Sequence, residues 1–187
     1  MMREAAPDAP APGALLISPP SEDDDPSFGR TVVLIVDREE NGITTGLVLN
    51  RPTERRAIEV AALAAVLVPD FGAVAFWGGP IGEDPVVLAE LTSSAGLDQF
   101  HLALEQPRPF PLPDVGLIAL GEHADAFDGR IRRGRLFVGL TVWHPWSLAR
   151  ELERGEWWVA PATPDDLFTS APEALLERAR ARAGRGE

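Results

Sequence analysis

The sequence predicts an α+β fold: a single domain built on a mostly antiparallel or mixed β-sheet with flanking helices. The first observation is the β-branched run Thr31–Val36, which Asn41-Gly42 connects to a second apolar run at Ile43–Leu49. Asn-Gly is a favoured turn pair, so the two runs predict an antiparallel hairpin, a connection that parallel strands cannot make. The second observation is that helical and strand-like segments are interspersed, with no linker that would divide the chain.

The chain begins with a segment that has little to bury. Residues 1–13 are rich in alanine and proline, and we expect them to form a flexible N-terminal tail. Ala14–Ser18 is a short apolar run that predicts the first strand, and the two prolines that follow it directly end that strand. After the hairpin, Thr53 is a suitable N-cap for a helix that continues to about Leu67 and ends before Pro69.

The second half of the chain predicts further strands and two longer helices. A helix over Pro145–Arg154 begins with proline, where a missing N–H matters least, and stops at a glycine. The main domain spans residues 14–170, and residues 171–187 form a C-terminal helix, at Pro172–Ala183, and a tail. The other expected elements are strands at Ala73–Trp77, Pro85–Leu91, Phe100–Leu104, Val115–Leu120, Arg135–Val142 and Glu156–Ala160, and a short helix at His123–Ile131.

Three amino-acid types are missing, and their absence excludes whole classes of chemistry. All 17 basic residues are arginine, so no lysine is present for a phosphate-binding loop or a Schiff base. The lack of cysteine removes thiol nucleophiles, thiolate zinc sites, iron–sulfur clusters and disulfides. The lack of tyrosine removes phenolic acid–base catalysis. We therefore expect no cofactor, and the sequence leans toward a protein that is not an enzyme.

The net charge of −12 restricts the partners of this chain. Affinity for phosphate backbones comes mainly from basic side chains that displace counterions, so nucleic-acid binding is not expected. Anionic membranes are disfavoured for the same reason. The longest apolar run, Val60–Val68, has nine residues and is too short to cross a bilayer, and the N-terminus lacks a secretion pattern. These features predict a cytoplasmic protein.

Metal and catalytic signals are weak along the chain. The histidines at 101, 123 and 144 are too far apart in sequence to form a metal-binding pair on one helix. Glu122, His123 and Asp125 place oxygen and imidazole donors close together, but a solvent-facing loop is the simpler interpretation. His144 is interpreted as a helix cap or a group packed against aromatic residues. We expect no metal site and no catalytic residue set.

Gly78-Gly79-Pro80 is the first candidate binding segment, because glycines after a strand can present backbone amides to an anion. Glu83 and Asp84 follow closely and would repel phosphate. We therefore favour a turn at Gly78 and Gly79 that lets two backbone segments pass at close distance.

Two polar residues at a strand end form the second candidate. Asn50 and Arg51 lie between the returning strand of the hairpin and Pro52, which keeps the residue before it extended. Arg51 is expected either to brace acidic loop residues or to line a cleft together with Asn50.

The last candidates are basic and aromatic. Arg132 and Arg133 belong to the basic run 130–135, which either binds an acidic partner or a phosphate or forms a solvated helix end. Trp157 and Trp158 must face opposite sides if they lie in a strand, so one of them is exposed. Trp158 near the arginines would then form a contact surface for a partner.

Five segments of the chain also carry a family resemblance. They are Gly13–Pro20, Asp25–Leu34, Asn41-Gly42 with Gly46–Pro52, Gly78–Pro80, and Gly139–Leu148 followed by Glu151, Leu152 and Trp157. In this order they resemble the YqgE/AlgH family over most of residues 13–168. Each segment alone is unspecific, whereas five in succession are specific. The residues that depart from the family pattern are Leu140, Val142, Trp146 and Ser147.

The resemblance implies a small bacterial cytoplasmic α+β protein of uncharacterised biochemical function. Some members of the family are labelled transcriptional regulators, and the family supplies no catalytic residue set that could be carried over. Direct DNA binding does not fit this chain, because its charge has the wrong sign and no helix-turn-helix with a basic recognition helix is evident.

Three hypotheses about function remain. The favoured one is a non-enzymatic YqgE/AlgH-like protein that acts by binding a protein or a small ligand. A regulatory role is one function that such binding could serve. The alternative is an enzyme or nucleotide-handling protein with a carboxylate, histidine and arginine site around Asn50-Arg51 and Gly78–Pro80. The third is a direct DNA-binding regulator. Convergence of Arg51 or a histidine with carboxylates in the deepest cleft would favour the enzyme.

Overall fold

The structure is a computed structural model and describes residues 10–20, 28–70, 72–92, 111–120 and 127–184. Its strands are β1 (Ala14–Ile17), β2 (Val32–Arg38), β3 (Thr44–Val48), β4 (Pro52–Arg56), β5 (Val74–Trp77), β6 (Ile81–Leu91), β7 (Val115–Ala119), β8 (Ile131–Trp143) and β9 (Trp158–Pro161). Within the described residues they form one sheet, in the order β4-β5-β8-β3-β2-β1-β9, with β6 and β7 branching from β8. Only β5 and β8 pair in parallel there, so the predicted α+β class with a mostly antiparallel sheet is confirmed.

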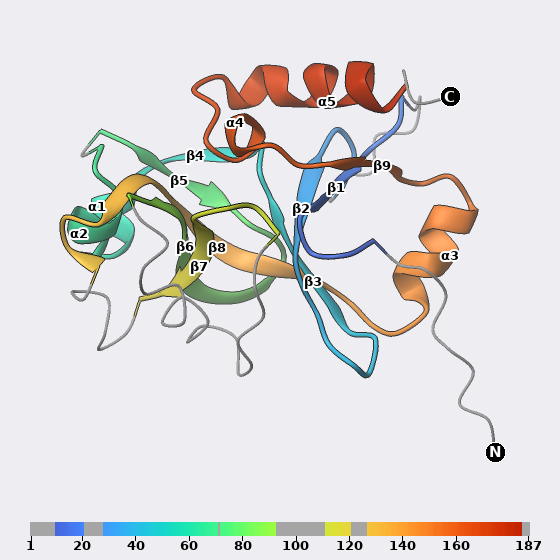
Figure 1. Cartoon of the computed structure of the whole chain (residues 1–187), viewed down its shortest axis with the longest axis horizontal. Helices are drawn as coiled ribbons and strands as arrows, with labels where there is room; N and C mark the ends of the chain where they lie inside the picture. The colour runs from blue at the N-terminus through green and yellow to red at the C-terminus, as the bar shows by residue number, and fades with distance from the viewer. Residues whose placement is uncertain (1–9, 21–27, 71, 93–110, 121–126, 185–187) are drawn as a thin grey trace.

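Strand β8 connects the two halves of the sheet (Figure 1). Along most of its 13 residues it pairs with β6, and Phe137 also lies in register with Phe76 of β5. Its last residues pair with β3, where Thr44 lies opposite Trp143. The end of β8 therefore carries Trp143 onto the half of the sheet that contains β1, β2 and β3.

The predicted hairpin is present as β2 and β3. Its turn is fixed locally, because the Asn41 side chain accepts a hydrogen bond from the Ile43 amide at 2.9 Å and Gly42 has φ +91°. Alternate residues of β2 point to opposite faces: Leu34 enters one core cluster and Val33 enters another. Both faces of β2 are thus covered, which explains a continuous apolar run in place of an alternating pattern.

Helices cover these two faces. Figure 1 shows α5 lying above β1 and β9, and α3 on the other side of β9 from α5. Leu175, Leu176 and Ala179 of α5 enter the first core, and Leu148 of α3 enters the core on the opposite face of β2.

In the described part of the chain, no helix has the length and hydropathy needed to span a membrane. The helices are α1 (Ala57–Val60), α2 (Ala64–Leu67), α3 (Ser147–Glu153), α4 (Pro164–Leu167) and α5 (Leu175–Ala183), with a 3₁₀ turn η3 at Pro172–Ala174.

The helix expected from Thr53 to Leu67 is wrong. Thr53 lies in β4, which pairs with β5, and its hydroxyl donates to the Ala75 carbonyl at 2.8 Å. Only α1 and α2, of four residues each, form in this segment. Pro52 keeps the preceding residue extended, and pairing with β5 then outweighs the local preference for helix.

Two other helix predictions need correction, and three predicted segments lie partly or wholly outside the described residues. The helix expected at Pro145 begins at Ser147, because Trp146 has the left-handed φ of +74° and interrupts the backbone before it. The helix expected up to Ile131 cannot extend that far, because Ile131 begins β8; its residues 123–126 lie outside the described part. The strand predicted at Phe100–Leu104 and residues 1–9 of the predicted tail also lie outside it.

Candidate aromatic ligand site

A tight turn at residues 28–31 precedes β2 and forms one wall of the candidate site. Arg30 adopts the left-handed region with φ +57°, which costs free energy for a residue other than glycine. Asn50 holds the turn in this form: its Nδ2 donates to the Arg30 carbonyl at 3.0 Å, and its Oδ1 accepts from the Val32 amide at 2.9 Å. The Asn50 side chain thus compensates the strain at Arg30 with two hydrogen bonds to the backbone.

Arg51 supports the same turn from its other side. One terminal nitrogen donates to the Gly29 carbonyl at 3.2 Å, and the guanidinium lies over the Trp77 ring, 5.0 Å from its centroid. The hydroxyl of Thr31 completes the turn by donating to the Phe28 carbonyl at 2.7 Å. Asn50 and Arg51, two predicted site residues, are therefore brought together, and both act on the backbone of residues 28–31.

Three aromatic rings meet behind this turn. Phe28 comes from the turn, Trp143 from the end of β8, and Trp157 from the residue before β9. Their ring centroids lie 6.1–6.4 Å apart, and Trp157 meets both other rings edge to face. Both tryptophans are buried, at 5% and 7% exposure. The three rings form a closely packed aromatic cluster whose members are distant in sequence.

Glu151 of α3 connects the two indoles. Its Oε2 accepts hydrogen bonds from Nε1 of Trp143 at 2.9 Å and from Nε1 of Trp157 at 2.7 Å. A carboxylate has further acceptor positions, and among the described residues Oε1 of Glu151 has no hydrogen-bond partner. The side chain is half-buried, so this oxygen is a hydrogen-bond acceptor for a molecule that enters the site.

A cavity of about 770 Å³ opens over this cluster, and we call it the aromatic pocket. Its size lies within the range of small-molecule sites, which combine apolar walls with a few polar groups. Glu151 is one of its polar groups, and the arginines at its edge are partly neutralised, since Arg154 pairs with Glu156 at 3.4 Å. The lining residues are Ser18, Pro19, Pro20, Phe28, Gly29, Arg30, Trp143, Glu151, Arg154, Gly155, Glu156, Trp157 and Arg180.

Gly78 and Gly79 do not line this pocket. As the sequence favoured, they let two backbone segments pass at close distance. A Cβ on Gly78 would lie 2.3 Å from the Gly139 carbonyl oxygen, and one on Gly79 would meet Leu140 equally closely. The amide of Gly78 donates to the Val138 carbonyl at 2.8 Å, so it is not free to bind an anion. The two glycines allow the chain between β5 and β6 to pass close to β8.

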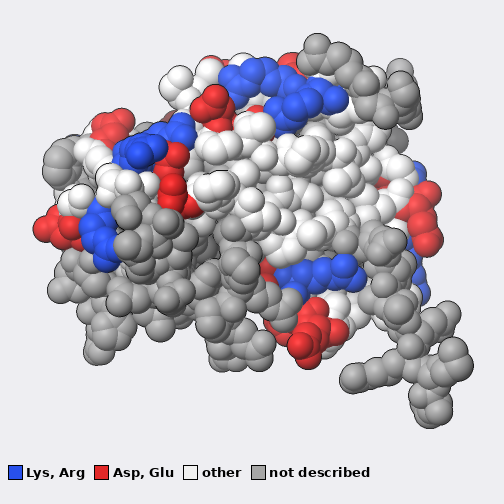
Figure 2. Space-filling model, viewed as in Figure 1, with Lys and Arg blue, Asp and Glu red and all other residues white. Residues whose placement is uncertain are grey.

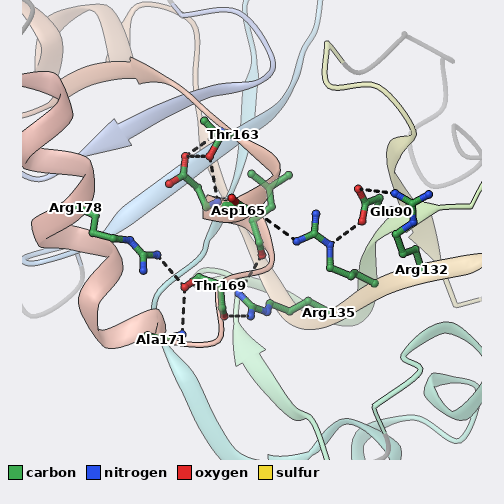
Figure 3. A network of polar contacts seen from close by, with 11 residues as sticks. Glu90, Arg132, Arg135, Thr163, Asp165, Thr169, Ala171 and Arg178 are labelled. Atoms are coloured by element: carbon green, nitrogen blue, oxygen red, sulfur yellow. Dashed lines mark hydrogen bonds and ion pairs between the residues drawn. The ribbon is translucent and has the colours of Figure 1, made fainter.

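Arg132 and Arg133 also lie away from the aromatic pocket, at the start of β8 (Figure 3). Nε of Arg133 lies 2.6 Å from Oε2 of Glu90, and Nη1 of Arg132 lies 3.8 Å from Oε1 of the same carboxylate. The hydrogen bond from Arg133 lowers the pKa of Glu90, against the effect of burial. The interpretation of this basic run as a solvated helix end is wrong, because it is a strand paired with β6.

The expectation that one of Trp157 and Trp158 is exposed is confirmed, although Trp157 precedes β9 and only Trp158 lies in the strand. Trp157 is buried in the aromatic cluster, while Trp158 is 37% exposed in β9, opposite Ile17 of β1. Trp158 and the exposed Val159 form an apolar edge of the sheet.

No histidine or metal cluster adds to the site within the described residues. His144 is exposed between β8 and α3 and does not line the aromatic pocket. His101 and the group Glu122, His123 and Asp125 lie outside the described part. Among the described residues, no group of three or more His, Cys, Asp or Glu side chains can hold a metal ion.

Basic and acidic side chains are interspersed on the face seen in Figure 2, and a broad uncharged area lies between them. The described residues of that face form no continuous cationic surface of the kind that phosphate backbones require.

Sequence reasoning missed the residues that form the pocket. Trp143, Glu151 and Trp157 were noted in the family segments but were not among the candidate site residues. One signal could have found them: three of the segments that carry the resemblance supply Phe28, Asn50 and Trp143, and these segments meet at the 28–31 turn and the aromatic pocket.

Comparisons with known proteins extend over the same part of the chain. A family model described as AlgH-like matches residues 15–186. A UPF0301 protein of Thermobifida fusca is 32% identical over 173 residues, which cover 92% of this chain and 86% of the relative. A UPF0301 protein of Streptomyces avermitilis is also 32% identical, over 87% of this chain and 81% of the relative.

Solved structures show the same fold. The crystal structure of protein DIP2367 from Corynebacterium diphtheriae has a TM-score of 0.76 and 26% identity, and the match covers 94% of this chain and 88% of that one. The solution structure of the AlgH protein from Pseudomonas aeruginosa has a TM-score of 0.66 and 25% identity, with 98% and 93% covered.

Proposed function

We propose that this chain, which belongs to the AlgH-like protein family, acts by binding a small planar molecule in the aromatic pocket. The observation that carries the proposal is the arrangement of Glu151, whose Oε2 joins two buried indoles while Oε1 has no partner among the described residues. The ligand class is a flat heteroaromatic compound that stacks on aromatic side chains and donates N–H groups to this carboxylate.

The 28–31 turn supports this proposal. Its strained residue, Arg30, is held by Asn50, and Arg51 holds the neighbouring carbonyl. Backbone strain held in place by surrounding groups is common at ligand sites, where it gives the wall a fixed shape before binding. A fixed wall reduces the entropy that binding would otherwise lose.

Binding without catalysis is the form of function that the lining residues favour. Among the described lining residues, the only hydroxyl belongs to Ser18, and its oxygen already accepts a hydrogen bond from the Thr31 amide at 3.0 Å. Among the described residues, neither Arg51 nor His144 lines this cavity, while His101 and His123 lie outside the described part.

Two probes of similar shape test the proposal by calorimetric titration of the full chain. 2-Aminobenzimidazole carries N–H donors along one edge, and 2-methylbenzoxazole has a similar fused ring system without a donor. We expect the first to bind at least about tenfold more tightly, because a hydrogen bond to a charged group contributes about 1.5–3 kcal/mol.

Variants on one helix provide the matched comparison. Glu151→Gln keeps the size of the side chain and removes its charge, and it should lower the affinity for 2-aminobenzimidazole by about tenfold. Glu153→Gln makes the same change at an exposed position of α3 and should leave binding unchanged. Equal affinity for both probes, or equal weakening by both variants, would contradict the proposed site.

A further inference from the structure

A second cavity, of about 450 Å³, lies at the other end of β8 and shares no lining residue with the aromatic pocket. We call it the arginine pocket, because Arg132, Arg133 and Arg135 all line it. Phe76 and Phe168 form apolar parts of its wall. Three guanidinium groups around one small cavity are unusual in a chain with a net charge of −12.

Arg135 is the central group of this pocket. It donates to the carbonyls of Leu167 and Thr169 at 3.0 and 2.5 Å (Figure 3). Its guanidinium lies 4.3 Å from the centroid of the Phe76 ring. Among the described residues it has no carboxylate partner, and burial lowers its pKa to about 10. Since a guanidinium has five N–H donors and two are used here, donors remain for a bound anion.

Three carboxylates lie near the three arginines, and one of them, Asp70, lines the cavity. Arg132 and Arg133 share the single carboxylate of Glu90. Asp165 reaches Arg133 only at 3.6 Å, with a side chain that is 97% exposed, so water screens most of its effect. Asp70 also lines the cavity, and its Oδ1 accepts from the Gly72 amide at 2.9 Å.

Aromatic rings fix the orientation of two guanidiniums. Arg133 lies 4.8 Å from the centroid of the Phe168 ring, and Arg135 lies 4.3 Å from that of the Phe76 ring. A guanidinium that stacks by its face keeps its N–H groups along its edge, where they can bind two oxygens of one anion. Thr169 lines the same cavity, and its hydroxyl oxygen accepts from the Ala171 amide, which leaves the hydroxyl hydrogen as a further donor.

We propose that the arginine pocket binds a small dianion, such as a phosphomonoester or a dicarboxylate, through Arg132, Arg133 and Arg135. The size of the cavity fits a small molecule, and its lining carries three guanidiniums and one carboxylate, that of Asp70, which suits a ligand with two negative charges. The site is independent of the function proposed for the aromatic pocket, because the two cavities have no residue in common.

Calorimetric titration of the full chain at low ionic strength tests the site with three probes. Phenyl phosphate and malonate represent the two sources of a dianion, and chloride is the monovalent control. We expect saturable binding of at least one dianion with a measurable heat, and none with chloride. Whichever dianion binds more tightly identifies the source of the oxyanion.

Two variants and one control locate the binding. Arg132→Gln removes the charge of a side chain that is 59% exposed and leaves the ion pair between Arg133 and Glu90 intact. It should lower the affinity for the dianion by about fivefold. Arg135→Lys keeps the charge but loses the planar arrangement of donors, and it should lower the affinity for the dianion by at least about tenfold. Arg150→Gln removes an exposed arginine on α3 and should change the affinity by less than about twofold.

The outcomes are distinct. Absence of binding by both dianions overturns the proposal, and so does equal weakening by Arg132→Gln and Arg150→Gln, which would indicate only general attraction by charge. If Arg135→Lys fails to fold, because this residue also holds the loop after α4, the comparison of Arg132→Gln with Arg150→Gln decides the matter alone.

Discussion

Removal of the Glu151 side chain perturbs the interaction on which the aromatic pocket depends most. Glu151→Ala leaves the Nε1–H groups of Trp143 and Trp157 without their acceptor, and both indoles are buried. An unsatisfied buried donor costs about 1–3 kcal/mol, so two would cost about 2–6 kcal/mol. Since Glu151 is half-buried and water can replace part of its role, we expect the free energy of unfolding to fall by about 2–4 kcal/mol.

Urea unfolding followed by far-ultraviolet circular dichroism measures this loss without relying on the affected indoles. Glu151→Gln retains an uncharged acceptor oxygen and should lose only about 1 kcal/mol. Glu153→Ala, at an exposed position of the same helix, should stay within about 0.5 kcal/mol of the wild type. The reasoning is refuted if Glu151→Ala unfolds at the wild-type urea concentration, or if Glu153→Ala is destabilised as much.

Three further predictions concern the rest of the sheet. Asn50→Ala should destabilise by about 1–3 kcal/mol and speed tryptic cleavage after Arg30, measured by gel and mass spectrometry, because the strained turn loses two hydrogen bonds. The arginine partner of Glu90 lowers the pKa of this carboxyl, so the ion pair stabilises the fold fully above the ordinary pKa of 4.5 and stabilises it less as the pH falls. Glu90→Gln should therefore lower the free energy of unfolding by about 1 kcal/mol at pH 7, and urea titrations at decreasing pH should show this difference from the wild type shrink. Gly78→Ala should cost about 1–3 kcal/mol or more in thermal unfolding, because its Cβ would meet the Gly139 carbonyl.

Much of the sheet could be predicted because its signals are local. Asn41-Gly42 between two apolar runs is sufficient to predict the β2–β3 hairpin, and the prolines at 19 and 20 mark the end of β1. The segment from Thr53 to Leu67 has a helical pattern, yet it forms a strand and two short helices, since β5 supplies a hydrogen-bonding edge that is distant in sequence. The left-handed turn at Trp146 has no sequence signal of the glycine or asparagine type.

The candidate site was predictable only in part. Asn50 and Arg51 stood out because a proline follows them at a strand end, but their targets, the carbonyls of Arg30 and Gly29, lie about twenty residues earlier. The pairing of Glu151 with Trp143 requires the turn at Trp146 to bring α3 back onto the end of β8. Such contacts depend on the path of the chain in three dimensions, which periodicity and spacing do not encode.

Fluorine NMR of the chain labelled with 5-fluorotryptophan tests ligand binding in the aromatic pocket most directly, because it reports on each of the five tryptophans separately. Resonances are assigned by single Trp→Phe variants, and 2-aminobenzimidazole is then titrated in. We predict that Trp143 and Trp157 shift together and saturate, while the exposed Trp146 and Trp158 stay in place. Shifts confined to the exposed tryptophans, or none at saturating probe, would contradict the account.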